Sequence, residues 1–267
     1  MRLSRFFRLP HPLLRRARRH RLIAMLLPIL LTVTILTPLY VIYKPPTFLI
    51  RYLAHRYPAI LWHFPSISTA TIALTIDDAP SEHTAELLEV LAENEAAATF
   101  FVIGGQAVGR EDVLRSIVAG GHELGNHGMH DEPATSLGTT ELARQIVDVE
   151  SLIAAAYSNT GGSPRKPPRY YRPGSGFFSR RMLDLTTDLG FKVVLGSVYP
   201  HDAQISSAWL NARHILSMAR PGAIIICHDR RSWTAPMLRI VLPALRRDGY
   251  EIVTVSQLVE QAQKGRG

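Results

Sequence analysis

Residues 71–80 read TIALTIDDAP, a short apolar run that ends in two neighbouring carboxylates. Every second residue of the run is large and apolar: Ile72, Leu74 and Ile76. This alternation predicts a strand with one buried face. Successive strand side chains point to opposite sides, so Asp77 and Asp78 can serve one pocket only if the chain bends there, and Ala79-Pro80 supplies a plausible bend. Taken alone, the dipeptide fits equally a solvated turn before a helix.

Strand and helix patterns alternate along the rest of the chain. Six more strands are expected near residues 97–103, 122–126, 168–172, 191–198, 222–227 and 250–255. Residues 97–103 and 223–226 are apolar on both faces, as in parallel strands that helices cover on both sides. Residues 142–156 carry apolar side chains at helical spacing. The pattern predicts an α/β fold, a (β/α) barrel of seven strands or, failing that, an open doubly wound sheet.

The N-terminal part of the chain has the composition of a membrane anchor. Residues 1–21 contain eight arginines and no acid, and residues 22–43 carry no charge over a length that suffices to cross a bilayer. The basic flank predicts a cytoplasmic N-terminus, with the rest of the chain on the far side of a single span. A cleaved signal peptide is the competing interpretation, but the apolar run is long for one. We expect a stalk at 44–70, one domain at 71–262 and a tail at 263–267.

Net charge bears on nucleic-acid binding, and cysteine content bears on disulfide formation. The formal charge of +8 equals the eight arginines of the leader, so the remainder is neutral by count and gives no indication of nucleic-acid binding. Cys227 is the only cysteine, so the chain forms no internal disulfide and depends on its apolar core for stability.

Polar side chains gather just after the predicted strands. They are Asp77, Asp78, His127, Asp131, Arg172, His201, Asp202, His228 and Asp229. The carboxyl ends of parallel barrel strands share one rim, where active sites lie. His127, His130 and Asp131 are candidate ligands, and one imidazole with two carboxylates suits Zn²⁺ or another divalent ion. His228 ends an apolar strand, where its imidazole could protonate a leaving group. Each motif by itself is more often a solvated turn or a packing residue.

Together, these segments resemble the polysaccharide deacetylases with a NodB homology domain, carbohydrate esterase family four. TIDDAP at 75–80 is similar to the first family motif, with Ile and Ala where the family has Phe and Gly. NHGMHD at 126–131, YRPGSG at 171–176 and the segment 221–229 are similar to the second, third and fifth motifs. YPHD at 199–202 stands in the place of the fourth but matches it weakly. The resemblance covers residues 71–262 and implies a distorted (β/α)7 barrel.

The resemblance also implies roles for individual residues. Asp77 corresponds to the general base and Asp78 to a metal ligand, with His127 as a second ligand. The family's third ligand is a histidine four residues on, where this chain has Asp131, so either Asp131 takes that role or His130 does with a shifted backbone. The other implied roles are Arg172 orienting the base, the Ser175 N–H binding the oxyanion and His228 acting as general acid, with Asp202 or Asp229 as its partner.

The implied activity is hydrolysis of N-acetyl groups on an acetylated glycan such as chitin, releasing acetate. The implied cofactor is a divalent metal, Zn²⁺ before Co²⁺, Mn²⁺ or Ni²⁺. Two other classes remain open from the sequence: a membrane-tethered carbohydrate-binding protein without turnover, suggested by Ala79, Asp131 and the weak fourth motif, and a hydrolase of a non-sugar amide. The glycan, the oligomeric state and the compartment on the far side of the membrane are not encoded in any motif.

Overall fold

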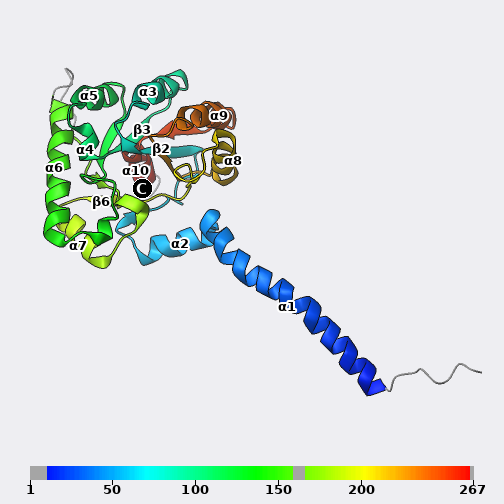
Figure 1. The fold of residues 1–267 in the computed structure, drawn as a ribbon. Helices are drawn as coiled ribbons and strands as arrows, with labels where there is room; N and C mark the ends of the chain where they lie inside the picture. The colour runs from blue at the N-terminus through cyan, green and yellow to red at the C-terminus, as the bar shows by residue number, and fades with distance from the viewer. Residues whose placement is uncertain (1–10, 159–165, 265–267) are drawn as a thin grey trace, which may run out of the picture. The chain divides into compact units, whose positions relative to one another are not determined.

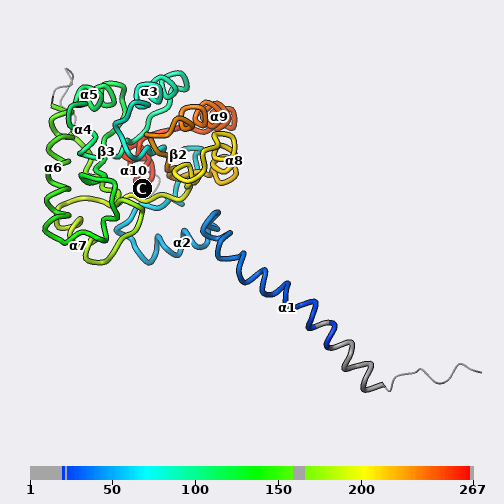
Figure 2. Tube along the Cα trace, viewed as in Figure 1, coloured from blue at the N-terminus to red at the C-terminus, as the bar shows by residue number. Residues whose placement is uncertain are grey.

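The computed structural model describes residues 11–158 and 166–264 and divides into two compact units between Pro46 and Thr47. Parts of two predicted segments, the basic tail 1–21 and the C-terminal tail 263–267, lie outside the described residues. Figure 2 traces the path of the chain, with the colour running along its length. Each unit is described by itself.

The first unit is one long helix, α1 (His11–Tyr43). Its segment Ile23–Tyr43 is long and apolar enough to cross a membrane and, in the described part of the chain, is the one helix that is so. None of that segment is buried against protein. Pro28 and Pro38 lie inside the helix without ending it. The apolar helix predicted at 22–43 is therefore present as a helix.

The second unit is built on a curled sheet in which every strand pairing is parallel. Its strands are β1 (Ile60–Leu61), β2 (Thr71–Ala79), β3 (Ala98–Val102), β4 (Glu123–Asn126), β5 (Tyr170–Tyr171), β6 (Lys192–Val194), β7 (Ile224–His228) and β8 (Glu251–Val253). The order is β1-β6-β5-β4-β3-β2-β7, and β8 pairs with β2. A parallel bridge between Val198 and Ile225 joins the segment after β6 to β7 and curls the sheet further. The predicted (β/α)7 barrel is confirmed in this distorted form.

Helices surround the sheet (Figure 1). They are α2 (Thr47–Arg56), α3 (Thr84–Glu93), α4 (Gly104–Ala107), α5 (Glu111–Ala119), α6 (Thr139–Ser158), α7 (Arg180–Asp188), α8 (Ala208–Met218), α9 (Thr234–Arg247) and α10 (Val255–Lys264), with single 3₁₀ turns at Ala134–Ser136 and Gly174–Gly176. The helical spacing predicted at 142–156 falls inside α6, whose buried stripe includes Ile146, Val149 and Ile153. This alternation of strand and helix brings the carboxyl ends of the strands to one rim.

The strand β2 lies at the centre of two apolar clusters. Its outer face, Ile72, Leu74 and Ile76, joins the main core between the sheet and the surrounding helices, as the alternation predicted. Its inner face starts with Ala73, which packs in a second cluster inside the barrel. That cluster includes Phe101, Val194, Ile224 and Leu258, the last of which α10 contributes. Both faces of the strand are buried, which is the environment that parallel strands require.

The bend that brings the two carboxylates together lies inside β2. The strand was expected to end near Ile76, but it continues to Ala79. Ile76 pairs with Phe100 and Ala79 with Val102, so β2 holds one more residue than β3 over this interval. Asp78 has a positive φ of 63°, which absorbs the extra residue. The bulge, rather than the Ala79-Pro80 step, breaks the alternation of side chains at Asp77 and Asp78.

The stalk predicted at 44–70 differs from the structure. Residues from Thr47 onward belong to the second unit. β1 extends the sheet, with Ile60 opposite Val193 of β6, and Ile67 is buried in the inner cluster. A two-residue strand is too short to show any hydrophobic period, so sequence patterning gave no signal for it.

Candidate active site

A cavity of about 610 Å³ opens at the carboxyl ends of the strands. Its lining includes seven of the residues singled out in the sequence: Asp77, Asp78, His127, Asp131, Arg172, Ser175 and His228. Asp202 lies beneath the lining, fully buried, whereas His130 and Asp229 are absent from it. A second cavity of about 620 Å³, beside α3 and α5, contains none of these residues. The rim therefore collects the predicted polar residues.

Asp77 is held in place by a buried guanidinium. Its Oδ1 lies 2.5 Å from Nη1 of Arg172, and both side chains are almost completely buried. The same Nη1 donates to Oγ1 of Thr75, two residues earlier on the inner face of β2. Two contacts from one nitrogen fix the carboxylate relative to the strand. The second oxygen of Asp77 is left to face the cavity.

Arg172 is itself anchored from three sides. Its Nε donates to the carbonyl of Val194 at 2.9 Å, and its guanidinium lies 4.1 Å from the ring centroid of Phe101. Burial lowers the pKa of Arg172, and the charge of Asp77 opposes that shift. A guanidinium this restrained serves to orient its partner rather than to move.

His127, directly after β4, and Asp78 of β2 face each other across the end of β3. His127 Nδ1 lies 2.7 Å from the carbonyl oxygen of Arg172, and since a carbonyl only accepts, Nδ1 carries the proton. Its Nε2 faces Asp78, 3.6 Å from Oδ1 of that residue. Burial raises the pKa of Asp78, and the imidazoles of His127 and His228 act in the opposite direction. An imidazole oriented through a backbone carbonyl beside a buried carboxylate is the usual arrangement of two metal ligands.

The third predicted ligand does not join these two. Asp131 has 51% of its side chain exposed, and its Oδ2 lies 3.9 Å from Nη1 of Arg230. His130 is exposed and lies beside Gly105, away from the cavity lining. Within residues 11–158 and 166–264, no three His, Cys, Asp or Glu side chains are grouped closely enough to hold a metal ion. Asp78 and His127 are thus placed as two metal ligands, and Asp131 lines the same cavity but is paired with Arg230.

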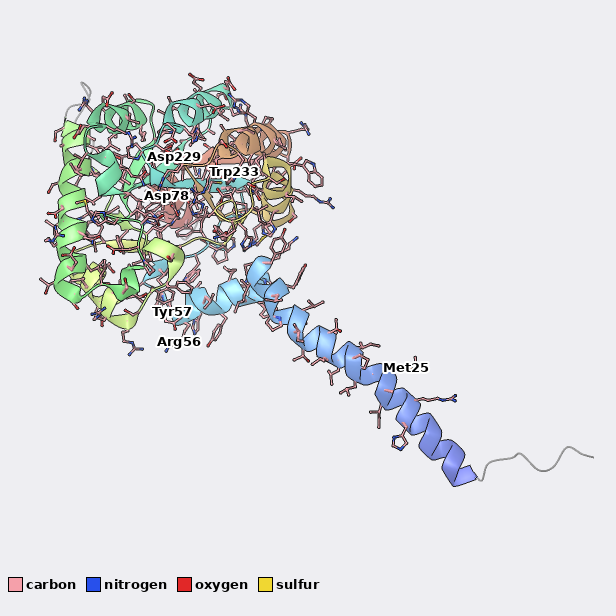
Figure 3. The ribbon with its side chains drawn as sticks, in the orientation of Figure 1. Met25, Arg56, Tyr57, Asp78, Asp229 and Trp233 are labelled. Atoms are coloured by element: carbon pink, nitrogen blue, oxygen red, sulfur yellow. The ribbon has the colours of Figure 1, made fainter. Side chains whose placement is uncertain are left out.

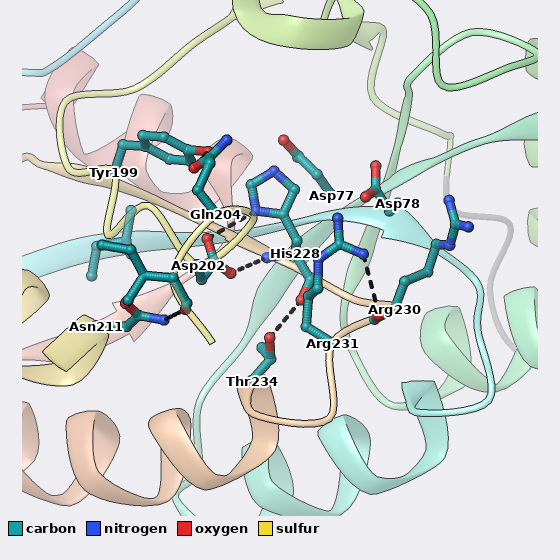
Figure 4. A network of polar contacts seen from close by, with 12 residues as sticks. Asp77, Asp78, Tyr199, Asp202, Gln204, Asn211, His228, Arg230, Arg231 and Thr234 are labelled. Carbon is teal, nitrogen blue, oxygen red and sulfur yellow. Dashed lines mark hydrogen bonds and ion pairs between the residues drawn. The ribbon is translucent and has the colours of Figure 1, made fainter. Parts of the chain in front are cut away.

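His228 is paired with Asp202, which settles the alternative left open by the sequence. Asp202 Oδ1 lies 2.9 Å from Nδ1 of His228, and Asp202 Oδ2 accepts the backbone N–H of the same residue at 2.7 Å. Figure 4 shows both contacts at the edge of the cavity. Burial lowers the pKa of His228, but the hydrogen bond and charge of Asp202, with the charges of Asp77 and Asp78, outweigh it and raise the pKa to about 9. The imidazole is therefore protonated at neutral pH, with Nε2–H left for the cavity.

Replacing Asp202 with Asn should move the alkaline limb of any activity that needs protonated His228 to lower pH, by about one to two units, since a hydrogen bond to a charged group contributes about 1.5–3 kcal/mol. The same change should remove a stabilisation that is fully present below pH 6.5 and lost as pH rises through about 9. Both effects are measured by comparing the wild type with Asp202→Asn, in pH–rate profiles and in thermal unfolding across pH. An alkaline limb at the same pH in both proteins would show that Asp202 does not control the titration of His228.

Asp229 has a structural role. Its carboxylate accepts hydrogen bonds from Ser81 Oγ at 2.6 Å and from Thr84 Oγ1 at 2.5 Å. Burial raises the pKa of Asp229, and the two hydroxyls oppose that rise. These contacts join the turn after β2 to the turn after β7, directly beyond the strand ends that carry Asp78 and His228. Figure 3 labels Asp229 and Asp78 close together in the same part of the barrel.

The loop after β5 contributes backbone to the cavity. Ser175 has a φ of 62° and lines the cavity with Gly176. A Cβ on Gly174 would lie 2.1 Å from the carbonyl oxygen of Glu132, so only glycine fits there. The YRPGSG segment is thus pressed against the turn that carries Asp131.

Sequence reasoning missed several residues of the cavity wall. Trp62 lines it but lies in the segment interpreted as a stalk. Tyr199, the first residue of the weak fourth motif, donates through its hydroxyl to Gln204 at 2.8 Å, and its ring lies edge-on with its centroid 5.8 Å from that of His228. Burial raises the pKa of Tyr199 to about 12, so its hydroxyl keeps its proton. Arg231 also faces the cavity. Tyr199 and Arg231 lie in or directly after a motif, whereas Trp62 has no motif near it.

Comparison with known proteins identifies the family. The family model described as polysaccharide deacetylase matches residues 66–194. The peptidoglycan-N-acetylglucosamine deacetylase of Bacillus cereus is 29% identical over 206 residues, which cover 75% of this chain and 92% of that protein. The chitooligosaccharide deacetylase of Sinorhizobium fredii is 32% identical over 201 residues, covering 70% of this chain and 91% of that protein.

Solved structures show the same relationship. The peptidoglycan deacetylase PdaC of Bacillus subtilis superposes with a TM-score of 0.67 at 28% identity, over 74% of this chain and 94% of that one. The family model, the relatives and the fold all point the same way, and the chain belongs to the polysaccharide deacetylases of carbohydrate esterase family four.

Proposed function

We propose that this chain hydrolyses N-acetyl groups of an N-acetylglucosamine-containing polysaccharide, with the help of a divalent metal ion that we assign as Zn²⁺. Water adds to the acetamide carbon, the carbon–nitrogen bond breaks, and acetate and a free amino sugar leave. The names of the relatives, which act on peptidoglycan and chitooligosaccharide, support the substrate class.

The observation that carries this proposal is the pairing of a base and an acid on adjacent strands. Asp77 of β2 is the register partner of His228 of β7, so both side chains reach the same part of the cavity. Arg172 forms a buried ion pair with Asp77, whereas Asp202 keeps His228 protonated. A carboxylate and a protonated imidazole that face one cavity can act as base and acid.

Each group then has one task. Asp77 takes a proton from the attacking water, because Arg172 holds one carboxylate oxygen and leaves the other towards the substrate. His228 gives its Nε2 proton to the departing nitrogen, which is too basic to leave as an anion. The backbone N–H of Ser175, in the turn fixed by Gly174, is assigned to the carbonyl oxygen as negative charge develops on it.

Asp78 and His127 would hold the metal ion, and Asp131 would complete the set by leaving Arg230. One imidazole with two carboxylates leaves positions open for water and substrate. An ion bound there lowers the pKa of a water and polarises the acetamide carbonyl. The bound charge would also favour the ionised form of Asp78, whose pKa is raised by burial and then by the charges of Asp77 and Asp131.

The proposal is tested by acetate release from chitin oligomers, using the purified full-length chain in detergent. We expect equal amounts of acetate and free amine, and no turnover of small cyclic amides. Binding of oligomers without release of acetate would favour the second candidate, a tethered carbohydrate-binding protein. Turnover of the cyclic amides alone would favour a non-sugar amide hydrolase.

The third ligand is tested by metal content. Asp131→Ala should lower the bound metal more than His130→Ala does, because Asp131 lines the cavity and His130 does not. Arg230→Gln, which frees Asp131, should keep the metal or raise its occupancy. Elemental analysis of the three purified variants gives the answer. A greater loss in His130→Ala would assign the ligand to His130.

We also propose that Ile23–Tyr43 anchors the chain in a membrane, with the arginine-rich end in the cytoplasm and the residues from Thr47 onward on the far side. The length and apolar composition of the helix support the anchor, and the positive charge before it supports the orientation. Protease protection in sealed vesicles tests both statements.

A further inference from the structure

The helix α2 has two different faces. Ile50 is only 3% exposed, and Leu53 and Ala54 are half-buried, so these three side chains form the face that packs on the barrel. They follow one another at helical spacing, and packing on the barrel accounts for their apolar character. Arg56 and Tyr57, at the end of this helix, are labelled in Figure 3.

The opposite face carries large aromatic side chains in the open. Phe48 is 74% exposed and Tyr52 is 61% exposed, and Arg51 and His55 are exposed between and beyond them. Positions 48, 51, 52 and 55 fall on one stripe of an α-helix. Exposed aromatic rings are poorly solvated by water, and a helix face of aromatic and basic residues suits the boundary between lipid headgroups and acyl chains.

The charge around this stripe has a single sign. Residues 44–76 contain Lys44, Arg51 and Arg56 and no acidic residue, and Asp77 is the first acid of the chain. Such a surface is complementary to anionic lipid headgroups.

The covalent chain limits where α2 can lie. Tyr43 ends the apolar segment and Thr47 begins α2, so four peptide steps separate them and span at most ~14 Å. The headgroup layer on each side of the hydrocarbon core is about 5–8 Å thick. If Ile23–Tyr43 spans the membrane, as proposed above, α2 starts in or beside that layer in any arrangement of the two units.

We propose that α2 docks on the membrane surface, with Phe48 and Tyr52 immersed at headgroup depth and the exposed Arg51 and Arg56 binding the phosphates of anionic lipids. The barrel is then held against the bilayer and does not swing freely on a linker.

The test uses the full chain in nanodiscs with a nitroxide label on Tyr52→Cys, and a matched label on Val108→Cys, an exposed side chain between α4 and α5. The native Cys227 is buried and does not compete for the label. We expect the Tyr52→Cys label to be accessible to oxygen and shielded from a water-soluble relaxation agent, and the Val108→Cys label to show the reverse. Equal exposure of both labels to the water-soluble agent would overturn the proposal, whether or not the chain deacetylates glycans.

The phosphate source is separated in the same system. In nanodiscs with 30% phosphatidylglycerol, Arg51→Gln and Arg56→Gln should each lower the ratio of immersed to exposed label about fivefold, with a far smaller effect in pure phosphatidylcholine. Added inorganic phosphate should leave the wild-type ratio unchanged. Displacement of the label by phosphate, or equal effects of the variants in both lipids, would contradict binding of anionic lipid.

Discussion

Replacing Asp77 with Asn is expected to lower the rate of acetate release from chitin oligomers by about 10²–10⁴-fold, the usual contribution of a positioned base. The amide keeps the shape of the side chain and can still accept from Arg172 Nη1, but it cannot take a proton from water. Steady-state kinetics with a fluorescent assay for the new amine measures the loss.

Two controls accompany this variant. Metal content should stay near that of the wild type, because Asp77 is not among the proposed ligands. Some loss of stability is expected, since Arg172 keeps its charge with a neutral partner, so the rate is normalised to folded protein and measured well below the unfolding temperature. Turnover within a few fold of the wild type would remove Asp77 from the proton transfer.

Replacing Arg172 with Met is expected to destabilise the fold by about 3–5 kcal/mol, because it leaves the carboxylate of Asp77 buried without a counter-charge. The change also removes the donors to Thr75 Oγ1 and to the carbonyl of Val194. Chemical denaturation of the purified chain, followed by far-UV circular dichroism, gives the change in the free energy of unfolding.

A double-mutant cycle separates the charge effect from the packing effect. Arg172→Met combined with Asp77→Asn should be less destabilised than the sum of the two single variants, since no uncompensated charge remains. Arg144→Gln, in an exposed ion pair of α6, is the matched control and should be nearly silent. Strict additivity in the cycle would mean that the Asp77–Arg172 pair has no energetic coupling.

The sequence predicted the strands well where they are long and buried. Residues 71–76, 97–103 and 222–227 carry enough apolar side chains to show their periods, and each contains or overlaps an observed strand. β1 has two residues and no period, so the segment around it was interpreted as a stalk. A periodic pattern can be recognised only within a segment of several residues. β1 is too short to show one, and it is a strand through its pairing with β6.

The candidate site was predictable to a similar extent. Parallel strands deliver their ends to one rim, and that rule alone brings Asp77, His127 and His228 together. The partner of His228 was not predictable, because the sequence gives no reason to prefer Asp202 over Asp229. Only the folded positions of the two loops show which carboxylate lies beside the imidazole. The pairing of Asp131 with Arg230 joins two turns about a hundred residues apart, and no spacing rule reaches that far.

The proposed deacetylation mechanism depends most on one divalent cation bound between the ends of β2 and β4. Metal titration of the chelator-treated protein tests this requirement most directly. We predict that the metal-free protein loses at least ~100-fold of its acetate release. One equivalent of Zn²⁺ per chain should restore it, and Asp78→Ala or His127→Ala should abolish the restoration. Full turnover by protein shown to be free of metal, or restoration that is unchanged in both variants, would contradict the account.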